Sequence, residues 1–150
     1  MALLLMITVL MLALDDFKTR SVSVLELFLY GICAFLFSFV KRGGMTALYN
    51  AGANLTALGM MLLFLQIYVN TRRKQHTPIL DNGIGIGDVI YLSVSSLLFT
   101  LQTYCWFIVV SCLAGLLYRL LRGDKVIPFV GVSSPVLITM LIAQCIYLNI

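Results

Sequence analysis

Charged residues are scarce in this chain, and their scarcity excludes a soluble globular domain. Lys, Arg, Asp and Glu make up 11% of the 150 residues, hydrophobic residues make up 61%, and the mean hydropathy is +1.05. Soluble domains carry about 25% charged residues. The net charge of +4 does not indicate a nucleic-acid partner, because the ten basic residues lie in short clusters between apolar runs. The chain is therefore predicted to be an integral membrane protein.

The chain also lacks the residue patterns of metal and disulfide sites. Its single histidine, His76, lies in a polar loop. The four cysteines lie in apolar stretches without a C-x-x-C pair, which favours small packing residues over a zinc site or a disulfide framework. They are Cys33, Cys105, Cys112 and Cys145. No metal and no cofactor are predicted.

Apolar runs bounded by charged or turn residues divide the chain into five segments, at 2–14, 22–40, 47–69, 89–121 and 130–150. The fourth is too long for one crossing, since a helix of that length would reach about 50 Å against a hydrocarbon core of about 30 Å. The polar patch at 102–104 is the predicted hairpin within it. The expected fold is all-α: a single domain over 1–150, with six transmembrane helices.

The basic residues predict the orientation of these helices. Only Lys41 and Arg42 lie in one set of connections, and the other eight basic residues lie in the other set. Because cytoplasmic loops are enriched in Lys and Arg, the larger set is predicted to face the cytoplasm and both termini to lie outside. The first run has neither the basic region nor the cleavage site of a signal peptide, so it is predicted to be a retained helix.

Two aspartates lie at the cytoplasmic ends of apolar runs. Asp16 follows the first run, and Asp88 follows Gly83, Gly85 and Gly87 directly before the fourth. At the helical rise each lies about 21 Å from the outer end of its helix, so the two carboxylates are predicted to share one depth. Ionisable groups near or below a membrane surface are functional candidates, because burying them is costly. Helix capping by aspartate is the alternative interpretation.

Two carboxyl groups held a few ångströms apart can hydrolyse a peptide bond. They cannot both ionise easily, so the pair would share a proton near neutral pH. The ionised member can deprotonate a water while the protonated member polarises the carbonyl and later assists the leaving amine. The glycines would leave room for a substrate backbone and would permit backbone angles closed to other residues.

Three stretches resemble the type IV prepilin peptidases, membrane aspartyl peptidases of the GxGD type. Residues 16–23, Asp-Phe-Lys-Thr-Arg-Ser-Val-Ser, are similar to the family's first motif, an Asp, five residues, Ile or Val, then Pro or Ser. Residues 85–89, Gly-Ile-Gly-Asp-Val, match the second, and 127–129, Ile-Pro-Phe, are similar to the third. By this resemblance Asp16 and Asp88 are the catalytic pair, and the spacing to Val22 favours Asp16 over Asp15.

The resemblance implies an aspartic-type endopeptidase of the bacterial cytoplasmic (inner) membrane, with its active site facing the cytoplasm. Its partners would be membrane lipid and a type IV prepilin or pseudopilin, cut after the terminal Gly or Ala of a basic leader. Glu26 is a candidate contact for that leader, and equally a polar residue at a helix start. A homodimer is left open. The paired C-x-x-C segment of the longer members is lacking, so a short form without methyltransferase activity is expected.

The chain departs from the family pattern at three points, of which Ser23, where proline is most common, is a tolerated variant. Two other functions stay open. Ile90 stands where the family often has a lysine, and Val130-Gly131 follows the third motif without the usual second proline. A small proton- or cation-coupled transporter could line its path with Asp16 and Asp88. A silent assembly subunit of a pilus or secretion system would need neither carboxylate for chemistry.

Overall fold

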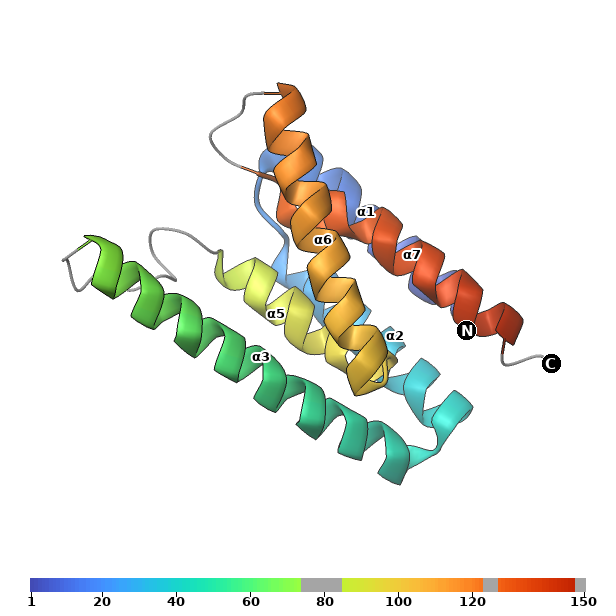
Figure 1. The fold of residues 1–150 in the computed structure, drawn as a ribbon. Coiled ribbons are helices and arrows are strands. Elements are labelled where there is room, and N and C mark those ends of the chain that lie inside the picture. Colours follow the sequence, from blue (N-terminus) through green and yellow to red (C-terminus); the bar gives the residue numbers. More distant parts are fainter. Residues whose placement is uncertain (74–84, 123–126, 148–150) are drawn as a thin grey trace.

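The computed structural model describes residues 1–73, 85–122 and 127–147, and these residues are almost entirely helical (Figure 1). They form six α-helices and one 3-10 turn, without any strand among them. The elements are α1 (Ala2–Thr19), α2 (Val24–Arg42), α3 (Gly44–Arg73), α5 (Ile86–Ser95), η1 (Ser96–Leu98), α6 (Leu101–Arg122) and α7 (Phe129–Tyr147). The predicted all-α class with six helices is confirmed.

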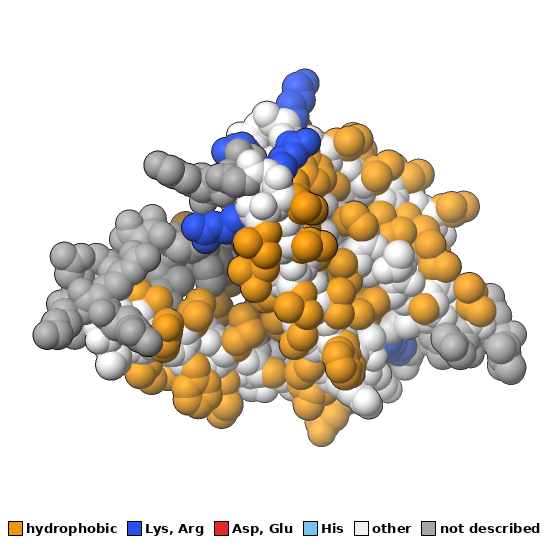
Figure 2. Space-filling view, turned by 45° about the horizontal axis from the view of Figure 1, so that its top comes forward, with side chains coloured by type: hydrophobic (Ala, Val, Ile, Leu, Met, Phe, Trp, Pro, Cys, Tyr) orange, Lys and Arg blue, Asp and Glu red, His pale blue; other side chains and the backbone are white. Residues whose placement is uncertain are grey.

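Four helices are long and apolar enough to cross a membrane: α2, α3, α6 and α7. Hydrophobic side chains cover the flanks of the molecule, as expected for a surface that faces lipid (Figure 2). The other two helices are more charged or shorter. The last turns of α1 carry Asp15, Asp16 and Lys18, and α5 with η1 reaches only about 20 Å. The two predicted catalytic aspartates thus lie on helices outside the four long spans.

The chain reverses direction between η1 and α6, earlier than predicted. The predicted hairpin at 102–104 is wrong, because those residues lie in the first turn of α6. The reversal lies at Phe99, which is extended, and Thr100. The carbonyl of Thr100 accepts the first hydrogen bond of α6, from the Tyr104 N–H at 2.8 Å, so Thr100 is the N-cap. A threonine before an apolar run is a helix start signal that the neighbouring polar patch obscured.

Asn54 of α3 holds this reversal in place from the neighbouring helix. Its Nδ2 donates hydrogen bonds to the carbonyl oxygens of Ser96 and Phe99, both at 2.8 Å. The Asn54 side chain is fully buried, so no water competes for these carbonyls. Nearby, the Tyr104 hydroxyl donates to the Leu92 carbonyl at 2.9 Å. Side chains of α3 and α6 therefore bind backbone carbonyl groups at the end of α5 and around η1.

We expect Asn54→Ala to lower the free energy of unfolding by about 2–3 kcal/mol, because it removes two buried hydrogen bonds and leaves two carbonyls without a partner. Denaturant or thermal unfolding in detergent micelles would measure this loss. Asn50→Ala, one turn earlier on α3, is the matched control and should cost clearly less. Equal losses in the two variants would contradict this role of Asn54.

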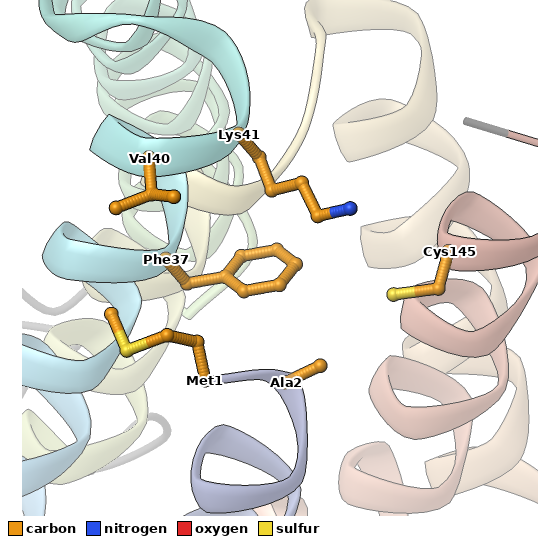
Figure 3. Close-up of a pocket in the computed structure, with 6 residues that line it drawn as sticks. All are labelled: Met1, Ala2, Phe37, Val40, Lys41 and Cys145. Atoms are coloured by element: carbon orange, nitrogen blue, oxygen red, sulfur yellow. The ribbon is translucent and has the colours of Figure 1, made fainter. Parts of the chain in front are cut away.

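The two ends of the helix bundle differ in character. At one end the start of α1, the end of α2 and the end of α7 meet around a hollow of about 360 Å³ (Figure 3). It is lined by Met1, Ala2, Phe37, Val40, Lys41 and Cys145. At the other end lie the last turn of α1 and the first turn of α7, because α1 and α7 run side by side in opposite directions (Figure 1). The first and last described turns of the chain thus share one end, as the topology prediction requires.

The basic side chains follow the same division. Figure 2 shows most of the visible Lys and Arg side chains gathered toward one end of the molecule, with a smaller basic patch away from it. Lys18 of α1 and the pair Arg119 and Arg122 of α6 lie in the last turns of their helices, at the end opposite the hollow. Lys74, His76 and Lys125 lie outside the described residues. Which membrane face this end occupies stays a prediction.

The four cysteines are free thiols. Cys105 and Cys112 are exposed on α6, so the prediction that all four are packing residues is wrong for these two. A helix that faces lipid on one side tolerates a thiol there, because the surroundings are as apolar as a protein core.

Candidate active site

Asp16 is buried in the last turn of α1, only 5% exposed, and binds the start of α7. Its Oδ2 accepts a hydrogen bond from the Gly131 N–H at 2.8 Å, and the Val130 N–H also acts on the carboxylate. The hydrogen bond from the Val132 N–H to the Pro128 carbonyl, at 3.0 Å, is the first of α7. The preceding amides therefore have no partner within the helix. Asp16 caps α7 from a different helix.

Asp88 is half-buried in the first turn of α5, where it is held by the N-cap residue Gly85. The Asp88 N–H donates to the Gly85 carbonyl at 3.1 Å, and the Gly85 N–H acts on the Asp88 carboxylate. A carboxylate in the first turn that binds back to the N-cap amide resembles a capping box. Each aspartate thus binds amides at a helix N-terminus, Asp16 at that of α7 and Asp88 at that of its own helix, and the capping interpretation describes what holds them.

The two carboxyl groups lie close enough to influence each other. Burial raises the pKa of Asp88 to about 6, and the negative charge of Asp16 adds to the effect while the Gly85 amide opposes it. Burial also raises the pKa of Asp16, against the opposing effect of the Gly131 and Val130 amides. Two carboxyl groups whose charges interact in this way titrate as a pair, which favours the state with one proton between them. The structure therefore brings together the two aspartates that the sequence analysis singled out.

Gly85 and Gly87 act through the space they leave rather than through their backbone angles. The prediction of angles closed to other residues is wrong for both, because Gly85 has φ −67° and Gly87 lies within α5. A Cβ at Gly85 would lie 3.2 Å from Oδ2 of Asp88, whereas one at Gly87 would lie 3.7 Å from Val22, an ordinary contact. Gly83 lies outside the described residues. Gly85 is the glycine whose replacement would crowd the carboxylate.

Asp15 acts on a different acidic residue, Glu26, rather than on Asp88. Glu26 lies in the first turn of α2, and its charge interacts with that of Asp15. The Oε2 atom of Glu26 is buried and accepts no hydrogen bond from any residue that the structure describes. Asp16, by contrast, binds α7 and acts on Asp88. The geometry therefore separates the roles of the adjacent residues Asp15 and Asp16.

The family model of the type IV leader peptidases matches residues 3–120. This chain belongs to the type IV leader peptidase family. The match includes both aspartates and the two stretches that carry them, and the Ile-Pro-Phe stretch lies beyond it. Searches among curated proteins and among solved structures found no match. The family indicates a peptidase, the apolar helices indicate a membrane protein, and the family resemblance is confirmed.

Gly131 is the residue of this leader peptidase site that sequence reasoning missed. It stands in the sequence only as a departure from the third motif, yet its amide binds Asp16. A Cβ at Gly131 would lie 2.8 Å from the Phe17 ring, so only glycine lets that ring pack here without a shift. The one available signal was the Ile-Pro-Phe stretch itself, because proline directly before an apolar run marks a helix start whose first amides are free.

We expect Gly85→Ala to lower kcat/KM of the leader peptidase by about tenfold to a hundredfold, because the added methyl group displaces the Asp88 carboxyl group by a few tenths of an ångström. A cleavage assay with purified protein would measure it. Gly87→Ala adds the same methyl group to the same helix against Val22 only, and should lose less. A larger loss in Gly87→Ala than in Gly85→Ala would contradict the conclusion that Gly85 leaves the space for the Asp88 carboxyl group.

Proposed function

We propose that this protein is an aspartic-type endopeptidase that removes the basic leader of type IV prepilin-like or pseudopilin proteins. The observation that carries the proposal is the pairing of Asp16 and Asp88 at the ends of two different helices, with the pKa of Asp88 raised to about 6. Membership of the leader peptidase family supports peptide cleavage. The carboxyl pair supports the aspartic type, because a shared proton supplies both an acid and a base.

The reaction needs one water and one proton on the pair. The ionised carboxylate takes a proton from the water as the water oxygen attacks the carbonyl carbon, and the protonated carboxyl group gives its proton to the carbonyl oxygen. The first carboxyl group then gives its new proton to the amide nitrogen, and the C–N bond breaks. The second recovers a proton from a hydroxyl of the intermediate as the acid product forms. The pair ends as it began.

The leader is proposed to enter from the cytoplasmic face of the bacterial inner membrane. Glu26 is the proposed contact for a basic leader residue, since its buried Oε2 has no partner among the described residues and a cation there would neutralise it. Ile90, where the family often carries lysine, is 44% exposed and offers no charge. Leader recognition is thus proposed to depend on acidic groups. Methyltransferase activity is not expected, and a homodimer is left open.

Co-expression with a prepilin that carries a basic leader tests this function. Mass spectrometry of the membrane fraction should find the prepilin shortened at the bond after the leader's terminal Gly or Ala. A prepilin in which that residue is replaced by a bulky one is the control and should stay intact. Full-length prepilin in the presence of the protein, together with proton flux in liposomes that contain it, would favour the transporter instead.

A further inference from the structure

The two carboxyl groups of the proposed peptidase have different surroundings. Asp16 receives amides from a second helix, α7, whereas the amide that binds Asp88 among the described residues is that of Gly85, at the start of its own helix. The free amides at a helix N-terminus carry partial positive charge and stabilise an anion that binds them. Burial of Asp16 by itself raises its pKa, but it also shields the hydrogen bond at 2.8 Å from competition by water, and the α7 amides act against the rise.

The Phe17 ring closes this contact from one side. It packs against Gly131, where an added Cβ would lie 2.8 Å from its Cε2, and its centroid lies 6.2 Å from that of Tyr118 on α6. Phe17 therefore packs the end of α1 against α6 and α7, next to the residue that carries the carboxylate. An anion on a helix that is packed in this way keeps its position better than one on a free helix end.

We propose that the N-terminus of α7 keeps Asp16 ionised, so that Asp16 is the base that deprotonates the water and Asp88 is the acid that carries the shared proton. Gly131 is then a positioning residue, which acts on the reaction through Asp16. This division of roles rests on the proposed function. It follows from the amides, because hydrogen bonds to the charged form of a carboxyl group favour that form.

The other charged groups near the pair do not reverse the assignment of the ionised form to Asp16 and the protonated form to Asp88. The Asp16 charge acts on Asp88, which favours a proton there once Asp16 is ionised. Glu26 of α2 interacts with Asp15, and the guanidinium of Arg122 lies over the Tyr118 ring at 5.5 Å. The first turn of α7 carries no acidic residue. Among the described side chains at the ends of α1 and α6, the other charged groups are Lys18, Arg20 and Arg119, all of them basic.

The test removes the Gly131 N–H in a background in which a side chain at residue 131 has room. Phe17→Ala makes room, and the double variants Phe17→Ala with Gly131→Ala and Phe17→Ala with Gly131→Pro then differ in whether residue 131 has an N–H. Proline is compatible with the first turn of a helix. The measurement is the pH profile of kcat/KM for prepilin cleavage, whose acid limb reports the base of the free enzyme.

The acid limb of the proline variant should lie about one pH unit above that of the alanine variant, because the ionised base has lost a charge-assisted hydrogen bond. An unchanged acid limb, or a shift of the basic limb alone, would overturn the assignment. A different result would contradict the proposed function itself: cleavage that persists in both Asp16→Ala and Asp88→Ala.

Infrared spectroscopy tests the same assignment if the proline variant is inactive. At a pH of about 5 the pair should hold one proton, which gives a protonated-carboxyl stretching band. This band should be lost in Asp88→Asn and kept in Asp16→Asn. Loss of the band in Asp16→Asn, with retention in Asp88→Asn, would reverse the two roles.

Discussion

Asp88→Asn and Asp16→Asn are each expected to lower prepilin cleavage by at least about a thousandfold, because residues that act as one catalytic unit lose nearly all activity when either is removed. Asparagine keeps the size of the side chain but can neither take a proton from water nor give one to the substrate. The measurement is kcat/KM of the purified protein in detergent, with a prepilin that carries a basic leader.

Asp15→Asn is the matched control, since it changes the adjacent carboxylate, which lies beside Glu26 and does not act on Asp88. It should retain cleavage. Retained cleavage in Asp16→Asn together with failure of Asp15→Asn would move the first catalytic residue by one position. Retained cleavage in Asp88→Asn would remove the aspartic mechanism altogether.

Stability measurements separate a catalytic loss from a folding loss. The pKa of Asp88 in the folded protein, about 6, lies above its ordinary value of 3.8. The fold therefore favours the protonated form, and this contribution to stability is lost as the pH rises through about 6. At pH 8 the ionised carboxylate destabilises the fold, so Asp88→Asn should unfold at the same temperature as the wild type or at a higher one. A marked decrease would point to a structural role.

Cleavage is expected to fall about tenfold for each pH unit above a basic limb near pH 6, because the reaction needs one proton on the pair and Asp88 loses it in that range. The sign follows from the raised pKa: the protonated form is present below about 6 and disappears above it. The measurement is kcat/KM across the pH range. Its pH dependence reports the pKa values of the free enzyme, whereas that of kcat reports those of the substrate complex.

The Asp15→Asn variant should keep the same basic limb, because Asp15 does not act on the pKa of Asp88. The unfolding temperature, followed over the same range, shows whether the activity falls without unfolding. Activity that is constant up to pH 9 would contradict a shared proton in the free enzyme. Activity that rises between pH 6 and 8 would contradict Asp88 as its carrier.

Much of the fold could be predicted from composition and spacing. Apolar runs separated by charged residues predict a membrane protein with six helices, because burial of a backbone in lipid leaves few alternatives to a helix. The 102–104 hairpin prediction failed because polarity alone cannot locate a reversal within a long apolar run. Thr100 caps α6 through its own backbone, and Asn54 binds the reversal from 42 residues away in sequence. The second contact is a property of packing between helices.

The sequence by itself determined which residues can do chemistry, since few carboxylates occur in so apolar a chain and only Asp88 follows a Gly-x-Gly motif at the start of an apolar run. Only the tertiary structure decided how the two aspartates differ. Asp16 meets the free amides of α7 because α1 and α7 pack side by side in opposite directions, and Gly85 leaves the space that the Asp88 carboxyl group needs. Local patterns encode helices and their termini, whereas the charge state of a buried group depends on which distant amides and charges the packing brings to it.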